Sequence, residues 1–200
     1  SLGHLTYSTL VHPGDNWEQM RSSLEEFVPQ IKQRLGVTGK FGVSLRISGS
    51  SAKTLSESAD ERLSLKAFLD ENGLYVFTIN AFPFGPFKGQ RVMEQVYEPD
   101  WTSQQRIEYT KSIADILVEI TDADVSPSIQ TAPLAFAPNV SDENYIAKFT
   151  TGVFEVLSHL YHLEHKTGRR VKLSIEPEPA CYLETTDETV EFFKRRIYSE

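Results

Sequence analysis

The sequence of 200 residues has little of what marks several large classes of protein. It contains one cysteine, Cys181, so no disulfide can form within the chain, and a single thiol fits a reducing compartment. No apolar run approaches the roughly 20 residues that a membrane-spanning helix needs, and the N-terminus lacks the basic and apolar regions of a signal peptide. We therefore expect a cytoplasmic protein without a membrane span.

Basic residues are also scarce. The 20 lysines and arginines are outnumbered by 28 aspartates and glutamates, which gives a formal net charge of −8. Binding to a phosphate backbone depends on clustered cations, so we expect a small-molecule partner and no nucleic acid. A glycine-rich phosphate-binding motif is absent as well, because VHPGDNW follows the first predicted strand. This argues against a dinucleotide-binding domain.

What the chain does contain is a regular alternation of strand and helix patterns. Strands are predicted at 4–11, 41–48, 74–82, 126–136 and 171–177, and the helices that follow them are predicted to be capped at Asp15, Ser58, Thr102, Ser141 and Thr185. Pro29 is expected to kink or split the first helix. Five consecutive strand and helix pairs predict a single domain over residues 1–200 with a parallel sheet and right-handed crossovers.

The side chains within each strand alternate in polarity. In the second strand the apolar residues Phe41, Val43, Leu45 and Ile47 alternate with Gly42, Ser44, Arg46 and Ser48. A doubly wound open sheet is covered by helices on both faces and would be apolar nearly throughout. A barrel instead turns its apolar positions towards the helices and its small and polar ones inwards. The alternation therefore favours an α/β barrel.

Four long motifs resemble a known family. They are GHLTYSTLVHPGDNW, LDENGLYVFTINAFPFGPF, EQVYEPDW and LSIEPEPACYLETTDETVEFF. They are similar to the EboE family of metabolite traffic proteins, within the xylose isomerase-like barrels that include sugar phosphate isomerases and epimerases. The resemblance implies a (β/α)8 TIM barrel with a divalent metal, Mn, Mg or Zn, held by carboxylates and histidine at the strand ends.

A complete barrel runs to about 250 residues. We therefore expect the 200 residues to be the first five βα units of a longer barrel, with the remaining metal ligands beyond residue 200 and with little or no turnover by this chain alone. The two open edges of such a sheet would invite pairing. A homodimer through these edges is a further prediction.

The glutamates after the fifth strand are the first candidate site residues. Period-two alternation turns Glu176 into the barrel interior at the C-terminal end of its strand, where barrel enzymes place their sites. The resemblance implies that Glu176 is the first metal ligand, since the family carries a Glu-Pro pair there. The alternative is an ion pair with Lys172 or Arg46. Glu178 and Glu184, on the loop above, are weaker candidates for substrate contact.

Three further polar residues end predicted strands. His12 can act as an acid or base or orient a sugar hydroxyl, although loop histidines are commonly inert. Arg46 can bind a carboxylate or phosphate through two hydrogen bonds, or form a salt bridge to Glu176. Asn80 ends the third strand on the interior side.

The loop after Asn80 reads FPFGPFKG. Its aromatic residues Phe82, Phe84 and Phe87 can form a wall against the apolar face of a sugar, or equally plug the barrel top or contact a partner.

Two functions are the main candidates for the chain. One is a metal-dependent isomerase or epimerase of a sugar-like metabolite, and the other is a non-catalytic metabolite-binding or traffic protein of the EboE type. Phosphodiester cleavage is the weakest possibility because of the acidic balance.

Overall fold

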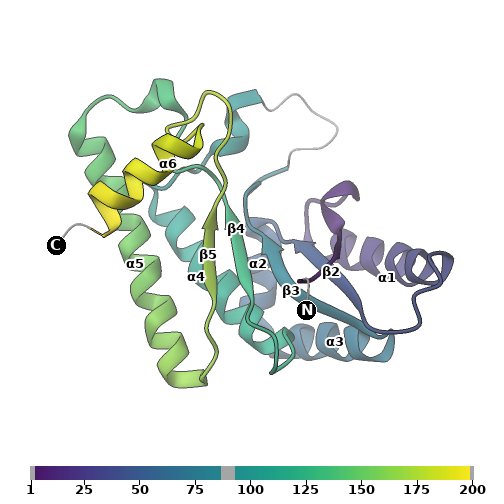
Figure 1. The fold of residues 1–200 in the computed structure, drawn as a ribbon. Coiled ribbons are helices and arrows are strands. Elements are labelled where there is room, and N and C mark those ends of the chain that lie inside the picture. The colour runs from purple at the N-terminus through teal and green to yellow at the C-terminus, as the bar shows by residue number, and fades with distance from the viewer. Residues whose placement is uncertain (1–2, 87–92, 199–200) are drawn as a thin grey trace.

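The computed structural model describes residues 3–86 and 93–198, which form a parallel sheet with helices between its strands (Figure 1). The strands are β1 (Thr6–Ser8), β2 (Phe41–Arg46), β3 (Leu74–Asn80), β4 (Ser128–Thr131) and β5 (Lys172–Ile175). The helices are α1 (Trp17–Arg34), α2 (Gly49–Glu57), α3 (Ala59–Glu71), α4 (Gln104–Ile120), α5 (Glu143–Thr167) and α6 (Thr186–Phe192). Short helical turns lie at Thr9–Val11, Met93–Tyr97, Ala137–Asn139 and Phe193–Ile197.

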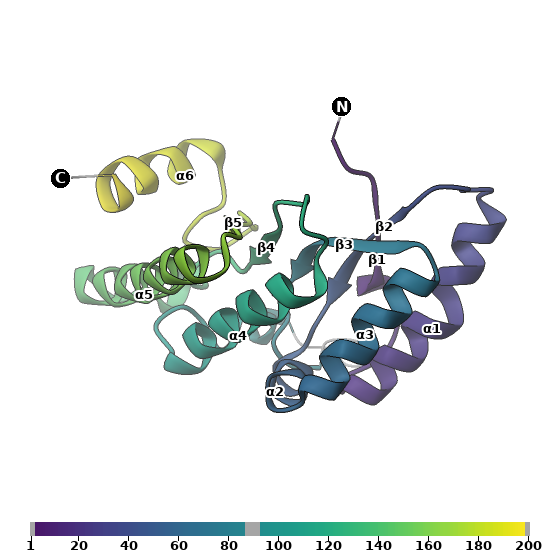
Figure 2. The same cartoon turned by 90° about the horizontal axis from the view of Figure 1, so that it is seen from below.

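The strands lie side by side in the order β1-β2-β3-β4-β5, all of them parallel. When every strand is followed by its neighbour in the same direction, right-handed crossovers place all the connecting helices on one face. Figure 2 shows α1 to α5 along one face of the sheet. A doubly wound sheet reverses its strand order and carries helices on both faces. The fold is therefore α/β with one parallel sheet, and its arrangement is compatible with part of a βα barrel.

The helix caps agree with the sequence prediction for two helices and differ by one residue for three. Ser58 caps α3, and Thr185 forms the predicted capping box with Glu188 at α6. In α1, α4 and α5 the capping side chain is that of the next residue along, namely Asn16, Ser103 and Asp142. Of the two outcomes predicted for Pro29, a kink or a split of the first helix, the split is wrong, because α1 runs through Pro29 from Trp17 to Arg34.

The two faces of the sheet differ in polarity, as the alternation predicted. Val43, Leu45, Ile79 and Ile129 point to the helices and are buried in the apolar core. We call the opposite side the open face. The strand register aligns two rows of polar residues across it: Ser44, Thr78, Ser128 and Lys172, and then Arg46, Asn80, Gln130 and Ser174 nearer the strand ends.

An irregularity in β3 keeps this alignment. The register between β2 and β3 shifts after Val43, which pairs with Val76, whereas Ser44 pairs with Thr78. Phe77 is thus an extra residue in β3, as in a β-bulge. The shift turns Thr78 and Asn80 towards the open face, where the Ser128 hydroxyl lies 2.9 Å from that of Thr78. Among the helices of the described residues, none is both long and apolar enough to cross a membrane.

Candidate functional site at the C-terminal ends of the strands

Three polar side chains from neighbouring strands are hydrogen-bonded in line on the open face. Asn80 ends β3, Gln130 lies in β4, and Glu176 directly follows β5. The Asn80 Nδ2 donates to Gln130 Oε1 at 3.2 Å, and the Gln130 Nε2 donates to Glu176 Oε2. The backbone N–H of Glu176 bonds the Thr131 carbonyl at 3.0 Å, so Glu176 continues the strand pairing of β5. The sequence-based placement of Asn80 and Glu176 on one side of the sheet is confirmed.

The direction of this chain of hydrogen bonds is set by the backbone. The N–H of Phe82 donates to Asn80 Oδ1 at 3.1 Å, so the Asn80 amide must turn its NH₂ group towards Gln130. Gln130 then presents its own NH₂ group to the Glu176 carboxylate. The chain of hydrogen bonds thus orients the Glu176 side chain and fixes one of its carboxyl oxygens. The partner of Glu176 is thus Gln130 rather than Lys172 or Arg46.

Glu178 lies two residues beyond Glu176 and is half-buried in the loop. Its backbone N–H bonds the Leu183 carbonyl at 3.0 Å, and its own carbonyl accepts from Cys181, which closes the loop into a tight turn. Burial and then the charge of Glu176 raise the pKa of Glu178. Glu178 therefore holds its proton more tightly than an exposed glutamate does, which suits a proton donor.

A row of three aromatic rings borders these groups. Phe82 stacks on Tyr97 with 5.7 Å between the ring centroids, and Tyr97 stacks on Phe136 at 5.9 Å. All three rings are partly exposed. We call Phe82, Tyr97 and Phe136 the aromatic row. It joins the loops that follow β3 and β4, and such a surface suits the apolar face of a ring-shaped metabolite.

The aromatic row is tied to the loop after β5 through Cys181. The Tyr97 phenol lies beside the Cys181 thiol, and Phe136 pairs with Cys181 in an antiparallel bridge. Burial, and then the neighbouring Cys181 thiol, raise the pKa of Tyr97 above its usual range. Burial likewise raises the pKa of the Cys181 thiol, so it stays protonated and unreactive at neutral pH. Cys181 thus has a structural role here.

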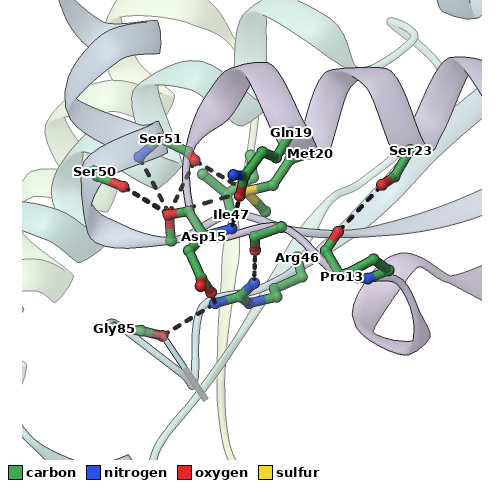
Figure 3. Close-up of polar contacts among 12 residues, drawn as sticks. Pro13, Asp15, Gln19, Met20, Ser23, Arg46, Ile47, Ser50, Ser51 and Gly85 are labelled. Atoms are coloured by element: carbon green, nitrogen blue, oxygen red, sulfur yellow. Dashed lines mark hydrogen bonds and ion pairs between the residues drawn. The ribbon is translucent and has the colours of Figure 1, made fainter. Parts of the chain in front are cut away.

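Arg46 ends β2 on the open face, but its guanidinium is taken up by loop backbone (Figure 3). It donates to the carbonyls of Gly14 and Gly85, the latter at 3.0 Å, and its Nη2 lies 3.9 Å from an Asp15 carboxylate oxygen. The side chain is 2% exposed, and burial lowers its pKa although Asp15 opposes the effect. These contacts, rather than a salt bridge to Glu176, join the loops after β1 and β3.

Two of the other predicted residues lie away from the aligned amides. His12 stacks on Phe27 of α1 at 4.8 Å, and its Nε2 is 2.9 Å from the Tyr7 hydroxyl, so it lies between β1 and α1. Phe84 packs edge-on against Tyr109 of α4 at 5.0 Å and covers Gly49 of α2, so its ring lies against the helices and away from the aligned amides.

The remaining predictions concern the loops. Glu184 is exposed, and its backbone N–H bonds the Glu188 side chain at the start of α6. Phe87 falls outside the described residues. The sequence reasoning missed Gln130 and Tyr97. Gln130 could have been predicted from the sequence, because period-two alternation in the fourth strand turns this residue to the same side as Asn80 and Glu176.

The fold and the site define an α/β protein with a polar sheet face whose C-terminal edge carries an amide–carboxylate chain beside aromatic rings. Comparison with models of known protein families gives no match, and a search of curated proteins finds no similar one. Within the described residues 3–86 and 93–198, no group of three or more His, Cys, Asp or Glu side chains is placed to hold a metal ion. The described donors near Glu176 therefore do not amount to a complete metal site.

Proposed function

We propose that the chain belongs to the xylose isomerase-like barrels, with the EboE family as its nearest resemblance, and serves as an isomerase or epimerase of a sugar or sugar-like metabolite. The observation that carries the proposal is the hydrogen-bonded line from Asn80 through Gln130 to Glu176 at the C-terminal edge of parallel strands. Ligands of α/β sheets and barrels bind at this edge. Fixed amide and carboxylate groups suit the hydroxyl groups of a polyol.

The chemistry follows from the two neighbouring carboxyl groups. Gln130 orients the Glu176 side chain, which can act as the base that accepts a proton from a carbon or hydroxyl of the substrate. Glu178 holds its proton to a higher pH than an exposed glutamate does, because burial and Glu176 raise its pKa, and it can donate in the same step. The aromatic row would exclude water from one face of the substrate.

A divalent metal, Mn, Mg or Zn, is the cofactor that the resemblance suggests. It would polarise carbonyl and hydroxyl oxygens of the substrate. Glu176 can contribute one oxygen, but the described residues near it do not supply a full ligand set. Further ligands would have to come from elsewhere, and no step of the proposal depends on the metal.

The second candidate is binding without turnover, as the EboE resemblance suggests. It is favoured by the neutral amides of Asn80 and Gln130 and by the aromatic row, which need no chemistry to recognise a polyol. The two functions separate in heavy water. An isomerase or epimerase that moves a proton through Glu176 exchanges a carbon-bound hydrogen of its substrate for deuterium and forms the isomeric sugar, both of which NMR detects in a panel of aldoses and ketoses, whereas a binding protein gives only ligand-induced shifts.

The residue-level test uses Glu176→Gln, with Glu184→Gln as the matched control because Glu184 lies in the same loop but is exposed. We expect loss of polyol and Mn²⁺ binding by isothermal titration, and of the slow deuterium exchange if the wild type shows it, in the first variant only. Equal behaviour of the two variants would contradict the role of Glu176. Binding of a polyol without exchange, unaffected by Mn²⁺, would favour the traffic function.

A homodimer through the sheet edges is also proposed. Within the described residues, β1 and β5 each pair with a single neighbour, so each presents one edge of backbone hydrogen-bonding groups. Leu5, beside β1, is 88% exposed. Sedimentation equilibrium should show a dimer that Leu5→Lys weakens, and a monomer at all concentrations would refute it.

A further inference from the structure

Arg106, in the first turn of α4, is a cation without exposure to solvent. Its exposed fraction is 0%, and its guanidinium lies 5.6 Å from the ring centroid of Tyr109 and 5.9 Å from that of Phe84. Burial lowers the pKa of Arg106, although the nearby acidic groups of Tyr109 and Asp100 oppose this effect. A cation in such surroundings needs hydrogen bonds, because leaving it unpaired is costly. Its Nε and Nη1 have partners, whereas Nη2 is buried without one among the described residues.

The hydrogen bonds of Arg106 go to both ends of one loop. Its Nε donates to the Pro99 carbonyl at 2.7 Å, and its Nη1 donates to the carbonyls of Ala81 and Phe82 at 2.8 and 3.1 Å. Ala81 and Phe82 directly follow β3, whereas Pro99 lies shortly before α4. The guanidinium thus fixes where the β3–α4 connection leaves the sheet and where it returns.

The backbone at Phe82, which Arg106 holds in place, also orients the candidate site. The carbonyl of Phe82 accepts from Arg106, and the N–H of the same residue orients the amide of Asn80. The Phe82 ring is the first of the aromatic row, which continues through Tyr97 to the thiol of Cys181. A shift of the Phe82 backbone would therefore disturb both the amide chain to Glu176 and the contact over Cys181.

We infer that Arg106 is a positioning residue for the site. Its guanidinium links the backbone carbonyl of Phe82 to that of Pro99 and so fixes the position of Phe82. This inference rests on the proposed function only for what the site binds, because the hydrogen bonds of Arg106 do not depend on a substrate. Lysine cannot replace it, because an ammonium group lacks the planar fork that reaches separate carbonyls in fixed directions.

The single cysteine provides the test. Cys181 is buried under Tyr97, so its reaction with a disulfide reagent such as Ellman's reagent measures how often the loops open. In Arg106→Met we expect this reaction to accelerate about tenfold or more, because hydrogen bonds to a charged group are lost next to the aromatic row. Arg106→Lys should lie between the wild type and Arg106→Met.

The matched control is Arg169→Met. Arg169 also donates to three backbone carbonyls, those of Thr121, Asp122 and Val125, but these lie in the α4–β4 connection, which precedes the N-terminal end of β4. It should lower global stability without accelerating the Cys181 reaction in the absence of urea. Local opening is nearly independent of low urea concentrations, whereas global unfolding depends on them steeply, so a urea series separates the two.

Each outcome is decisive. The inference would be overturned if Cys181 reacted no faster in Arg106→Lys and Arg106→Met than in Arg169→Met. It would also be overturned if the Cys181 rate followed global unfolding alone. If Arg106→Met does not fold, Arg106→Lys is judged by the same criterion. Failure of the proposed function is seen separately, as equal polyol and Mn²⁺ binding by the wild type and Glu176→Gln, and leaves the thiol measurement unaffected.

Discussion

Replacing Gly152 in α5 by alanine should lower the stability of the fold, although helix propensity alone predicts the opposite. In the interior of a helix, alanine is normally more stable than glycine by about 0.5–1 kcal/mol. Here a Cβ atom would lie 2.6 Å from the carbonyl oxygen of Trp101 and 3.0 Å from Ile107 Cδ1. An ordinary contact begins near 3.4 Å, so α5 and the Trp101 backbone would have to move about 0.8 Å apart.

The size of the effect depends on whether that oxygen can move. Trp101 is fully buried, and its backbone N–H bonds the Leu134 carbonyl at 3.0 Å, so the obstacle is fixed backbone rather than a flexible side chain. Overpacking of a dense core costs about 1–3 kcal/mol, which outweighs the helix preference. Gly152→Ala should therefore lose about 1–2 kcal/mol, or about 2–8 °C in melting temperature for a chain of this length.

Urea and thermal unfolding followed by circular dichroism would measure the loss. Ser158→Ala is the control, because Ser158 is an exposed residue of the same helix, and there the preference for alanine should act alone and leave stability equal or slightly higher. If Gly152→Ala melts at the wild-type temperature or above it, the close packing of α5 on the Trp101 backbone is refuted.

Three further predictions concern buried and paired groups. Tyr145→Phe removes the 2.5 Å hydrogen bond to the buried Asp100 carboxylate and should lower the free energy of unfolding by about 1.5–3 kcal/mol, measured in urea. Burial raises the pKa of Asp122, but hydrogen bonds from two lysines outweigh it and leave the pKa lowered. Its stabilisation should thus be present at neutral pH, and the difference between wild type and Asp122→Asn should vanish as the pH falls below about 4. For Glu178, burial and Glu176 raise the pKa, so the charged form destabilises the fold, and Glu178→Gln should increase stability at pH 7 but not at acid pH.

The strand pattern carried most of the fold because its physical signal is local. Alternation in β2 separates the apolar Val43 and Leu45, which belong to the core, from the polar Ser44 on the other face, although all three are buried. Helix starts were less certain, since adjacent polar residues such as Asp15 and Asn16 can both cap, and only the backbone angles decide between them. The sequence did not predict the short helix α2. Among its nine residues only two apolar side chains reach the core, those of Ala52 and Leu55.

The candidate site was predictable where it depends on the direction of a side chain from a strand. Glu176 and Asn80 follow from the period of two, and Gln130 follows from the same rule. Contacts made by loops were not predictable. The Tyr97 ring meets Phe82 and Phe136 only because of the path of a long connection, and the guanidiniums of Arg46 and Arg106 bond to backbone carbonyls, which every residue has and no sequence pattern marks.

The chemistry of the open face and the order of the strands lead independently to the same arrangement. A second layer of helices on the open face would bury the exposed side chains of Lys172 and Ser174 and the partly exposed ones of Gln130 and Glu176, which is unfavourable unless every one is paired. The consecutive strand order places α1 to α5 on the opposite face, so no crossover of these strands supplies such a layer. A curved sheet with helices outside and hydroxyls, amides and a carboxylate inside meets both conditions. The proposed barrel therefore rests on two separate physical requirements, strand connectivity and the pairing of polar groups, rather than on the resemblance alone.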